Sequence, residues 1–480
     1  MYSLLIIYLY NLISKILNYF CSMPRKNRKK KFYNLSVIDA GAKGKSIAKA
    51  PDGKVIFINN AIPGDIIDVQ TFKKRKGFYE GTATKVHELS KDRITAPCDH
   101  FGICGGCKWQ NMSYSRQLYY KDKEVKNNLE RIGKLKINNI IPILGSNKIF
   151  FYRNKMEFSF SNNRWLTMDE VESKEPLNQR NGLGFHIPGM WDKILDINKC
   201  WLQKDPSNEI RNKLKSFAIE KKISFFDPKK QVGILRTLMV RTTSIGHIMV
   251  VVQFHSGSQE DIYIVLNYLK NTFPYINSLQ YVVNNKCNDT IYDQEVICFH
   301  GEDYIMEEME GLKFKINAKS FYQTNSEQAY ELYKITREFA ELSGDELVYD
   351  LYTGIGTIAQ FIAKKAKKVI GVESVKEAVI AAKQNAILNK IDNVDFFVGD
   401  MKKIFNDNFI NINGIPNIII ADPPRNGMHI DVVKQILKIG PEKVIYISCN
   451  SASQARDLFL MSSQYQVIKS QAVDMFPQTH

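Results

Sequence analysis

The sequence has few cysteines for its length, and it has no internal repeat and no low-complexity segment. Eight cysteines among 480 residues are too few for a disulfide scaffold, which excludes the small secreted domains that disulfides hold together. A chain of 480 residues is too long for a single hydrophobic core, so we expect two or three domains. Hydrophobic residues make up 44% of the chain and charged residues 24%, the composition of an ordinary globular protein.

The chain also has fewer acidic than basic residues. The chain has 50 aspartates and glutamates against 66 lysines and arginines, which gives a formal net charge of +16. Such an excess favours a polyanionic partner, of which nucleic acid is the commonest, although solubility alone would also explain it. The run RKNRKKK at residues 25–31 is typical of a solvated tail that can also contact phosphates.

Residues 1–31 form a hydrophobic and then basic extension that lacks the features of an export signal. MYSLLIIYLYNLISKILNYF is long enough for a membrane-spanning helix, but Asn11, Lys15 and Asn18 interrupt it. A basic start and a small-residue cleavage site are both missing. Since Met23 follows directly, we interpret the hydrophobic part as an upstream start or a dispensable extension. We therefore expect a cytoplasmic protein without a stable membrane partner.

Residues 32–92 are predicted to form a small β-barrel. The strand-like runs VIFI (55–58) and DIIDVQTF (65–72) alternate with turn signals at PDG (51–53) and PG (63–64). The following KKRKGFY interleaves basic and aromatic residues, as in OB-like barrels that bind single-stranded nucleic acid. The alternative is a structural β module with a basic rim.

Residues 93–317 are predicted to form a central domain that is rich in β-strands. A helical pattern begins at Tyr114, and β-like runs such as GHIMVVVQFH and QYVVNN occupy residues 151–315, where we expect an antiparallel sheet. Cys287 and Cys298 also lie in this domain, and a buried, inert thiol is the default state of such a cysteine.

Residues 318–480 change to a repeated order of strand, glycine-rich turn and helix. The predicted strands end in ELVYD, KVIGVE, VDFFVGD, NIIIADPPR and KVIYISC. Strands that alternate with helices predict a parallel, doubly wound sheet of the Rossmann-like type. The chain as a whole is therefore predicted to be an α/β multidomain protein.

A cofactor site is predicted at the turn DLYTGIGT, where the first of these strands meets a helix. Gly354 and Gly356 allow the backbone to approach a ligand closely. Glu373 follows Asp350 by 23 residues, at the end of the second strand, where a carboxylate can accept both hydroxyls of a ribose. The third glycine of the dinucleotide fingerprint is replaced by alanine, which that fingerprint tolerates. DPPR at residues 422–425 decides between nicotinamide and S-adenosylmethionine as the cofactor. The glycine-rich turn, the acidic end of the second strand and DPPR together are typical of an S-adenosylmethionine-dependent methyltransferase.

Cys449 ends the fifth strand, in KVIYISCNSAS, and it is a candidate nucleophile. Uracil C5 is a poor nucleophile until a thiolate adds to C6 and makes an enolate, which can accept a methyl group at C5. A base must then remove the C5 proton so that the thiol leaves. Arg425 stands after the prolines, where many amine methyltransferases have an aromatic residue, and this favours a carbon target. The alternative for Cys449 is a buried, inert thiol.

Six motifs together resemble the RNA uracil-C5 methyltransferases: DLYTGIG, ADPPR, YISCNSAS, VDMFPQTH, FYRNKMEFSF and KSFYQTN. The resemblance covers residues 32–480 and includes the family's TRAM domain, an RNA-binding barrel, at residues 32–92. Within the family it is closest to the branch that methylates a uridine of large-subunit (23S) ribosomal RNA. It implies that RNA is the partner, and we expect the protein to be a monomer.

By position, the resemblance implies that Cys449 is the nucleophile. It also implies an S-adenosylmethionine site lined by Gln323, Tyr352, Glu373 and Asp422, with Thr357 near the donor. Tyr352 has an alternative role in core packing, and Gln323 could instead cap a helix.

A second group of cysteines is spaced like a metal site. Cys98, Cys104 and Cys107 follow C-x5-C-x2-C, and Cys200 lies far downstream. Four thiolates suit either a [4Fe–4S] cluster or structural zinc. The five-residue gap argues against radical S-adenosylmethionine enzymes, which use C-x3-C-x2-C. The family resemblance includes this spacing and implies a [4Fe–4S] cluster with a structural or RNA-positioning role.

The family pattern continues past DMFP-x-T to a glutamate that is the expected base for the C5 proton. The sequence ends at His480, so this glutamate would lie just beyond it. A clipped sequence, a substitute base such as His480 and a catalytically impaired RNA-binding protein are the three explanations. Two other activities stay open: a transfer-RNA uridine methyltransferase with the same chemistry, and, more distantly, an amine methyltransferase.

Overall fold

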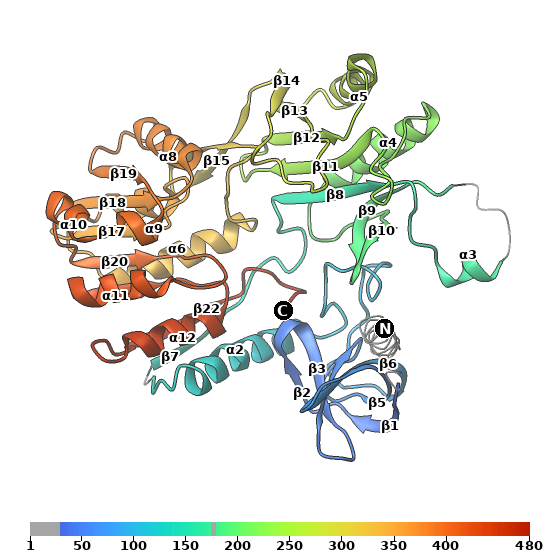
Figure 1. Cartoon of the computed structure of the whole chain (residues 1–480), viewed down its shortest axis with the longest axis horizontal. Helices are drawn as coiled ribbons and strands as arrows, with labels where there is room; N and C mark the ends of the chain where they lie inside the picture. Colours follow the sequence, from blue (N-terminus) through green and yellow to red (C-terminus); the bar gives the residue numbers. More distant parts are fainter. Residues whose placement is uncertain (1–28, 138, 174–178) are drawn as a thin grey trace, which may run out of the picture. The chain divides into compact units, whose positions relative to one another are not determined.

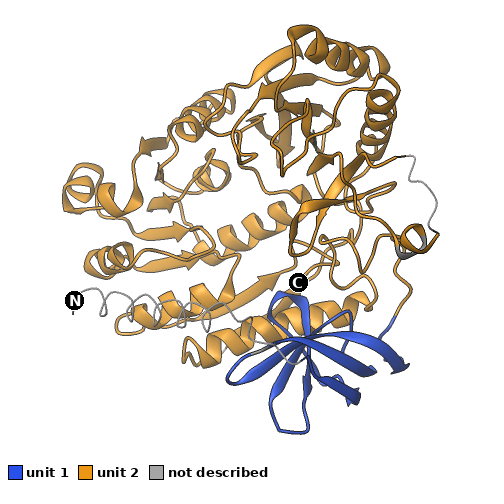
Figure 2. Cartoon of the chain, turned by 45° about the vertical axis from the view of Figure 1, so that its right-hand side comes forward, with its two compact units in different colours: residues 1–93 blue, residues 94–480 orange. Residues whose placement is uncertain are grey.

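The computed structural model describes residues 29–137, 139–173 and 179–480 (Figure 1). The chain divides into two compact units, residues 1–93 and residues 94–480 (Figure 2). The interpretation of residues 1–22 lies outside the described residues. Within the described part, no helix is long and apolar enough to cross a membrane.

The first unit is an all-β fold. Its six strands pair in the order β1-β5-β6-β4-β3-β2, and β4 and β6 are the parallel pair. The strands are β1 (Lys31–Ser36), β2 (Asp39–Gly41), β3 (Lys45–Lys49), β4 (Val55–Asn59), β5 (Ile66–Lys74) and β6 (Phe78–Glu88). Alternate residues of β4, Ile56 and Ile58, are fully buried, as expected for strands with one face on a core. A Cβ at Gly81 would lie 2.7 Å from Cγ1 of Val69, so β5 and β6 can pack this closely only with glycine there.

The second unit begins with a mixed sheet of seven strands. Their order is β10-β9-β8-β11-β12-β13-β14. The strands are β8 (Lys155–Ser161), β9 (Gly182–Ile187), β10 (Met190–Asp196), β11 (Leu235–Thr242), β12 (Ile248–Phe254), β13 (Ser278–Val283) and β14 (Ile297–Gly301). The expectation of an antiparallel sheet is wrong at one pair, because β12 and β13 are parallel. A parallel pair needs a crossover, and α5 (Gln259–Thr272) provides it.

Several other elements accompany this sheet. α4 (Ser207–Glu220) contacts α5. The hairpin of β15 (Tyr304–Met309) and β16 (Leu312–Asn317) contacts α8 (Lys376–Leu388). α3 (Met168–Glu172) lies between β8 and β9 in the chain.

A second sheet has five strands, all parallel, in the order β19-β18-β17-β20-β21. This confirms the predicted doubly wound sheet. The strands are β17 (Leu347–Leu351), β18 (Lys368–Glu373), β19 (Val394–Val398), β20 (Ile418–Ala421) and β21 (Lys443–Tyr446). The helices are α6 (Ser326–Ala340), α7 (Thr357–Ala363), α8 (Lys376–Leu388), α9 (Met401–Ile404), α10 (Asp407–Asn413), α11 (Ile430–Ile439) and α12 (Ser451–Met461).

Both faces of this sheet are covered, which explains its continuous apolar strands. Val348 and Ile420 belong to a core that they share with α6, α7 and α8. Their neighbours Tyr349 and Ile419 point to the opposite face, into a core shared with α9, α10 and α11. Alternation along each strand therefore fills two separate cores, and it leaves the strand ends free to hold functional groups.

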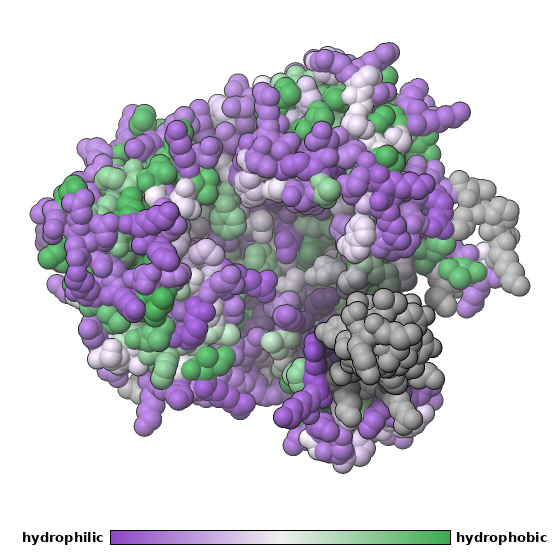
Figure 3. Space-filling view, in the orientation of Figure 1, coloured by the Kyte–Doolittle hydropathy of each residue, from purple (hydrophilic) through white to green (hydrophobic). Residues whose placement is uncertain are grey.

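The end of the chain returns to its beginning within the second unit. β22 (Lys469–Val473) pairs in parallel with β7 (Asn139–Leu144) and does not join the five-stranded sheet. α2 (Tyr114–Arg131) packs beside α12 (Figure 1). Nδ2 of Asn128 donates a hydrogen bond to Oγ of Ser451 at 2.8 Å. Figure 3 shows hydrophilic side chains over most of the visible face, with small groups of hydrophobic residues between them.

Candidate active site

Four of the five parallel strands present a candidate residue where the strand ends. Tyr352 follows β17, Glu373 is the last residue of β18, Asp422 follows β20, and Cys449 lies shortly after β21. The carboxyl ends of parallel strands share one edge of a sheet. β17 and β20 are neighbours at the point where the strand order reverses, which is where open α/β sheets bind ligands. The fold therefore gathers these residues around one crevice.

The turn after β17 is built from backbone conformations that favour glycine. Gly354 has φ of +58° and Gly356 has φ of +79°, while Tyr352 has φ of +67°, which is rare for a bulky residue. A Cβ at Gly356 would lie 2.7 Å from Cζ of Phe396, so a larger residue does not fit there. The backbone N–H of Gly354 donates to Oε2 of Glu373 at 3.1 Å. The carboxylate at the end of β18 thereby holds the turn.

Three carboxyl groups lie close together beneath this turn. Asp350 is fully buried, and its Oδ2 accepts hydrogen bonds from Oγ1 of Thr353 and from the backbone N–H of Ala359. Its Oδ1 has no partner among the described residues. Burial, together with the negative charges of Asp422 and Glu373, raises the pKa of Asp350 to about 7. Burial also raises the pKa of Asp422 to about 6. These three carboxyl groups therefore form an acidic cluster at the ends of the strands, which we call the acidic pocket.

A tyrosine from α6 reaches the same group. Tyr333 is buried, and its hydroxyl lies 3.4 Å from Oγ1 of Thr357, the first residue of α7. Burial, and then the charges of Asp422 and Asp350, raise the pKa of Tyr333. Thr357 therefore lies next to the carboxylates, on the side that faces α6.

The loop after β19 adds another carboxylate near Tyr352. Asp400 caps α9, and its Oδ1 accepts a hydrogen bond from the backbone N–H of Lys402 at 3.0 Å. Burial raises the pKa of Tyr352 to about 12, and the charges of Asp457, Asp400 and Glu373 act in the same direction. Tyr352 packs in part against the apolar core and also lies among these acids.

Gln323 lies in the loop that leads into α6. Nδ2 of Asn154 donates to the carbonyl oxygen of Gln323 at 2.9 Å, and the backbone N–H of Asn154 donates to that of Thr324 at 2.8 Å. The cap of α6 is Asn325, whose side chain accepts from the backbone N–H of Gln328. The alternative in which Gln323 caps a helix is therefore wrong, and its side chain is left for another role.

Cys449 is exposed, so the alternative of a buried thiol is wrong. It lies between β21 and α12, next to Asn450, which caps α12. Nδ2 of Asn450 and Oγ of Ser453 donate to the carbonyl oxygen of Arg425 at 3.1 and 3.0 Å. These two hydrogen bonds fasten the turn that carries the cysteine to the loop of Asp422-Pro423-Pro424-Arg425. The turn that carries the thiol is therefore held beside the loop that carries Asp422.

A separate cavity of about 320 Å³ brings the four spaced cysteines together. Cys98, Cys104, Cys107 and Cys200 all line it, although Cys200 is far from the others in sequence. Basic side chains line it as well, namely Arg153, Lys155 and Lys199. In the described part of the chain, no three His, Cys, Asp or Glu side chains are placed so that they could hold a metal ion.

The four thiols of this cavity are desolvated. Burial raises the pKa of each of them, to about 11 for Cys104 and about 12 for Cys107. The other two cysteines of the β-rich region, Cys287 and Cys298, are both exposed. The default expectation that these two are buried is wrong, because Cys287 lies in a loop and Cys298 in the edge strand β14.

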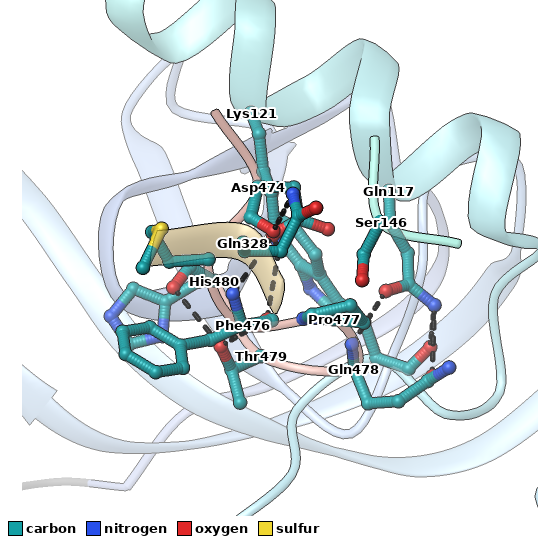
Figure 4. Close-up of polar contacts among 12 residues, drawn as sticks. Gln117, Lys121, Ser146, Gln328, Asp474, Phe476, Pro477, Gln478, Thr479 and His480 are labelled. Carbon is teal, nitrogen blue, oxygen red and sulfur yellow. Dashed lines mark hydrogen bonds and ion pairs between the residues drawn. The ribbon is translucent and has the colours of Figure 1, made fainter. Parts of the chain in front are cut away.

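The segment of residues 474–479 contacts α2 and the start of α6 (Figure 4). Gln478 is buried and makes a reciprocal pair with Gln117 of α2, at 2.9 and 3.0 Å. Its carbonyl oxygen accepts from the backbone N–H groups of Lys108 and Trp109, directly after Cys107. The segment is thus held against the cysteine-bearing part of the unit.

The beginning of the same segment holds the loop of Gln323. Oδ1 of Asp474 accepts from Nζ of Lys121 at 2.6 Å, and its other carboxylate oxygen accepts from the hydroxyl of Tyr114 at 2.8 Å (Figure 4). The carbonyl oxygen of Asp474 accepts from Nε2 of Gln328, at the start of α6. VDMFPQTH, which the sequence marks as a family motif and as the approach to the expected glutamate, thus contacts both the segment after Cys107 and the start of α6.

Comparison with known proteins agrees with this geometry. Residues 235–480 match the family described as tRNA (uracil-5-)-methyltransferase. An RNA methyltransferase of Bacteroides thetaiotaomicron is 53% identical over 92% of this chain and 97% of its own length. This chain belongs to the RNA uracil-C5 methyltransferase family. A second RNA methyltransferase of the family, from Porphyromonas gingivalis, is 49% identical over 93% of this chain and 97% of its own length.

A solved structure of the family has the same fold. The tRNA (uracil-54, C5)-methyltransferase of Pyrococcus abyssi, in complex with S-adenosyl-L-homocysteine, superposes with a TM-score of 0.71. The two are 28% identical, and the match covers 93% of this chain and 97% of the other. The α/β multidomain architecture with a methyltransferase domain, and the RNA methyltransferase activity of the family, are therefore established for this chain.

In this methyltransferase, the sequence pointed to the candidate residues at the strand ends. It did not point to the neighbouring residues that contact them or act on their charge. Asp350 marks only a spacing in the sequence, although it is fully buried and feels the charges of Asp422 and Glu373. Tyr333 and Asp400 were not singled out. Asp400 had a signal, because it ends VDFFVGD at the third strand, but Tyr333 had none, since a tyrosine on an amphipathic helix is usually core.

Proposed function

We propose that this methyltransferase transfers a methyl group from S-adenosylmethionine to C5 of a uridine in 23S ribosomal RNA, through a covalent bond between Cys449 and C6. One observation carries the proposal. An exposed cysteine lies on a turn that is hydrogen-bonded to the Asp-Pro-Pro loop of an acidic pocket. A nucleophile beside the site of a cationic methyl donor is what this chemistry requires.

The acidic pocket fits S-adenosylmethionine, which supplies an electrophilic methyl group on its sulfonium. The ligand has one net positive charge at neutral pH, and the negative charges of Asp422 and Glu373 both act to raise the pKa of Asp350. Oδ1 of Asp350, which has no hydrogen-bond partner in the described part of the chain, adds an acceptor. The carboxylates would hold the cation, and Gln323 and Tyr352 would flank it. The relative from Pyrococcus abyssi, which holds S-adenosyl-L-homocysteine, supports this assignment.

Cys449 would act as the nucleophile of the reaction. Its thiolate forms a bond to C6 of the uracil, and the electron pair of the C5–C6 double bond is displaced toward the carbonyl at C4. C5 then forms a bond to the methyl carbon of S-adenosylmethionine, the bond between that carbon and the sulfonium sulfur breaks, and S-adenosylhomocysteine leaves. A base then takes the proton from C5, the double bond re-forms, and the bond between sulfur and C6 breaks. We infer that the uridine is flipped out of its RNA to reach the exposed thiol.

The test is tritium release from RNA with C5-tritiated uridine, given S-adenosylmethionine, with Cys449→Ala as the control. We expect release by the parent and none by the variant. RNA that stays attached to Cys449 in a denaturing gel, without release, would mean that attack occurs and that the final proton transfer fails. Neither release nor attached RNA, with RNA still bound, would favour a protein that only binds RNA.

Transfer RNA is the second candidate substrate. The family description and the Pyrococcus abyssi relative both name tRNA. The same assay with unmodified 23S ribosomal RNA and with unmodified bulk tRNA separates the two. Faster tritium release from tRNA than from ribosomal RNA would replace the ribosomal assignment and leave the chemistry unchanged.

We propose further that the cysteine cavity holds a [4Fe–4S] cluster. Four thiols from two distant segments line one cavity, and its volume of about 320 Å³ far exceeds the ~30 Å³ of a single water molecule. A structural zinc site would be closed tightly around one ion. The basic lining from Arg153, Lys155 and Lys199 suits an anionic thiolate cluster. Four iron and four sulfide per chain are expected on anaerobic purification, whereas one zinc without iron would overturn the proposal.

Residues 32–92 are proposed to be an RNA-binding TRAM domain. Tyr33 and Phe72 are exposed aromatic residues on its strands β1 and β5, and basic residues stand beside them in the sequence. Exposed rings and lysines bind single-stranded nucleic acid by stacking and by charge. Tyr33→Ala should weaken RNA binding at fixed salt and leave binding of S-adenosylmethionine unchanged. We place the protein in the cytoplasm, as a monomer.

A further inference from the structure

Trp201 lines the cysteine cavity and packs against two further aromatic rings, and no step of the proposed chemistry uses these three side chains. The ring centroid of Trp201 lies 5.8 Å from that of Phe150 and 5.5 Å from that of Phe151. Nζ of Lys199 lies 4.2 Å from the centroid of Trp201. Lys199 and Trp201 also line the cavity, on either side of Cys200. We call Phe151, Lys199 and Trp201 the aromatic platform.

The backbone is strained so that one ring of the platform faces outward. Phe151 has φ of +54°, a left-handed conformation that is unfavourable for a bulky residue. Its N–H donates to the carbonyl oxygen of Trp201 at 2.8 Å, which holds the conformation in place. Phe151 is 36% exposed, while the next residue, Tyr152, is buried. Strain of this kind persists where the surrounding structure enforces it, and it clusters at ligand sites.

The chemistry of the platform indicates its occupant. A hydrophobic protein partner would be met by an apolar patch without charge at its centre. Here an exposed lysine lies over the indole, and Arg153 and Lys155 line the adjoining cavity. Rings interleaved with cations recognise unpaired nucleotides, because each base has a face to stack and each phosphate a charge to neutralise.

We propose that the aromatic platform stacks one unpaired base of the RNA substrate, with Lys199 on an adjacent phosphate. The inference rests on the proposed function for the presence of RNA. The stacked base is not the target uridine, because the platform borders the cysteine cavity whereas Cys449 belongs to the edge of the parallel sheet. The cysteine cavity therefore supports an RNA-reading surface, and this surface selects RNA with an unpaired nucleotide at a fixed place.

The first test is binding of single-stranded and fully duplex RNA by the full chain at fixed salt. Trp201→Ala should weaken binding of the single strand by about 5-fold to 150-fold, since loss of one stacking ring is worth ~1–3 kcal/mol. Binding of the duplex should change little, and Trp201→Phe should retain most of the affinity. Trp191→Ala, which removes a 64% exposed tryptophan on β10, is the matched control and should bind like the parent.

Two further variants separate stacking from folding and from charge. Phe151→Gly removes the ring and relieves the strained backbone, so we expect a melting temperature no lower than that of the parent but weaker binding of single strands. Lys199→Gln should lower the salt dependence of binding by about one unit of slope, whereas Trp201→Ala should leave the slope unchanged.

The proposal is wrong if Trp201→Ala and Phe151→Gly bind single-stranded RNA as tightly as the parent. Equal losses for duplex and single strand, or an equal loss in Trp191→Ala, would also overturn it. These readouts do not depend on methyl transfer. A failure of the proposed function appears as absent tritium release in the parent, whatever the variants bind.

Discussion

Asp350 should make the ligand-free protein less stable as the pH rises. Its pKa is raised from 3.8 to about 7, so between these values the folded chain keeps a proton that the unfolded chain has lost. The free energy of unfolding then falls by about 1.4 kcal/mol per pH unit. Below pH 3.8 both states are protonated, and above about pH 7 both are ionised, so the loss is confined to this window.

The full loss is on the order of 4 kcal/mol, because about three pH units separate the two values. Asn has the same shape without the charge, and its carbonyl oxygen can keep the hydrogen bonds from Thr353 and Ala359. Asp350→Asn should therefore be more stable than the parent by about 1–2 kcal/mol at pH 5 and by about 4 kcal/mol at pH 8. Urea unfolding without ligand, followed by circular dichroism from pH 5 to 8, measures the difference.

The same substitution should weaken binding of S-adenosylmethionine at pH 8. Binding of S-adenosylhomocysteine should suffer less, because that ligand lacks the sulfonium charge. In the parent, the affinity for S-adenosylmethionine should rise from pH 5 to 8 as Asp422 and Asp350 ionise, with pKa values of about 6 and 7. Calorimetry with both ligands checks this.

A buried carboxylate with full partners is the control. Oδ2 of Asp457 accepts from the hydroxyl of Tyr446 and the N–H of Met428, and its Oδ1 accepts from Arg456. Asp457→Asn should therefore destabilise the protein. The reasoning about Asp350 is refuted if Asp350→Asn is less stable than the parent at pH 8, or if the difference does not change with pH.

Two further predictions concern stability. Asp474→Asn leaves the Lys121 ammonium buried without its carboxylate, so urea unfolding should show a free energy of unfolding lower by about 3–5 kcal/mol. Adding Lys121→Gln to the same chain should restore much of this loss. An equal loss in the double variant would contradict the prediction. Gly356→Ala should cost more than Gly354→Ala, because both have positive φ but only the Cβ at 356 meets the ring of Phe396; Gly354→Ala should lose about 1–2 kcal/mol, and equal losses would argue against the steric reason.

The sequence by itself determined the features that depend on neighbouring residues. The alternation of strands and helices predicted the parallel sheet, since each strand there is covered on both faces and is apolar throughout. Gly354 and Gly356 indicated a turn that needs positive φ. Cys449 directly follows a predicted strand, which puts it at the carboxyl edge of the parallel sheet. Each of these signals lies in a short stretch of neighbouring residues, where local backbone geometry determines the secondary structure.

Only the tertiary structure decided which distant groups meet. It placed Asp350 beside Asp422 and left one oxygen of the former unpartnered, which a pattern of apolar residues cannot reveal. It paired Gln117 with Gln478 and set Phe151 against Trp201, although no periodicity connects them. It also made β12 and β13 parallel and left Cys287 and Cys298 exposed. These outcomes depend on long-range packing, in which residues far apart in the chain compete for the same space. Local sequence patterns do not report which of these residues come into contact.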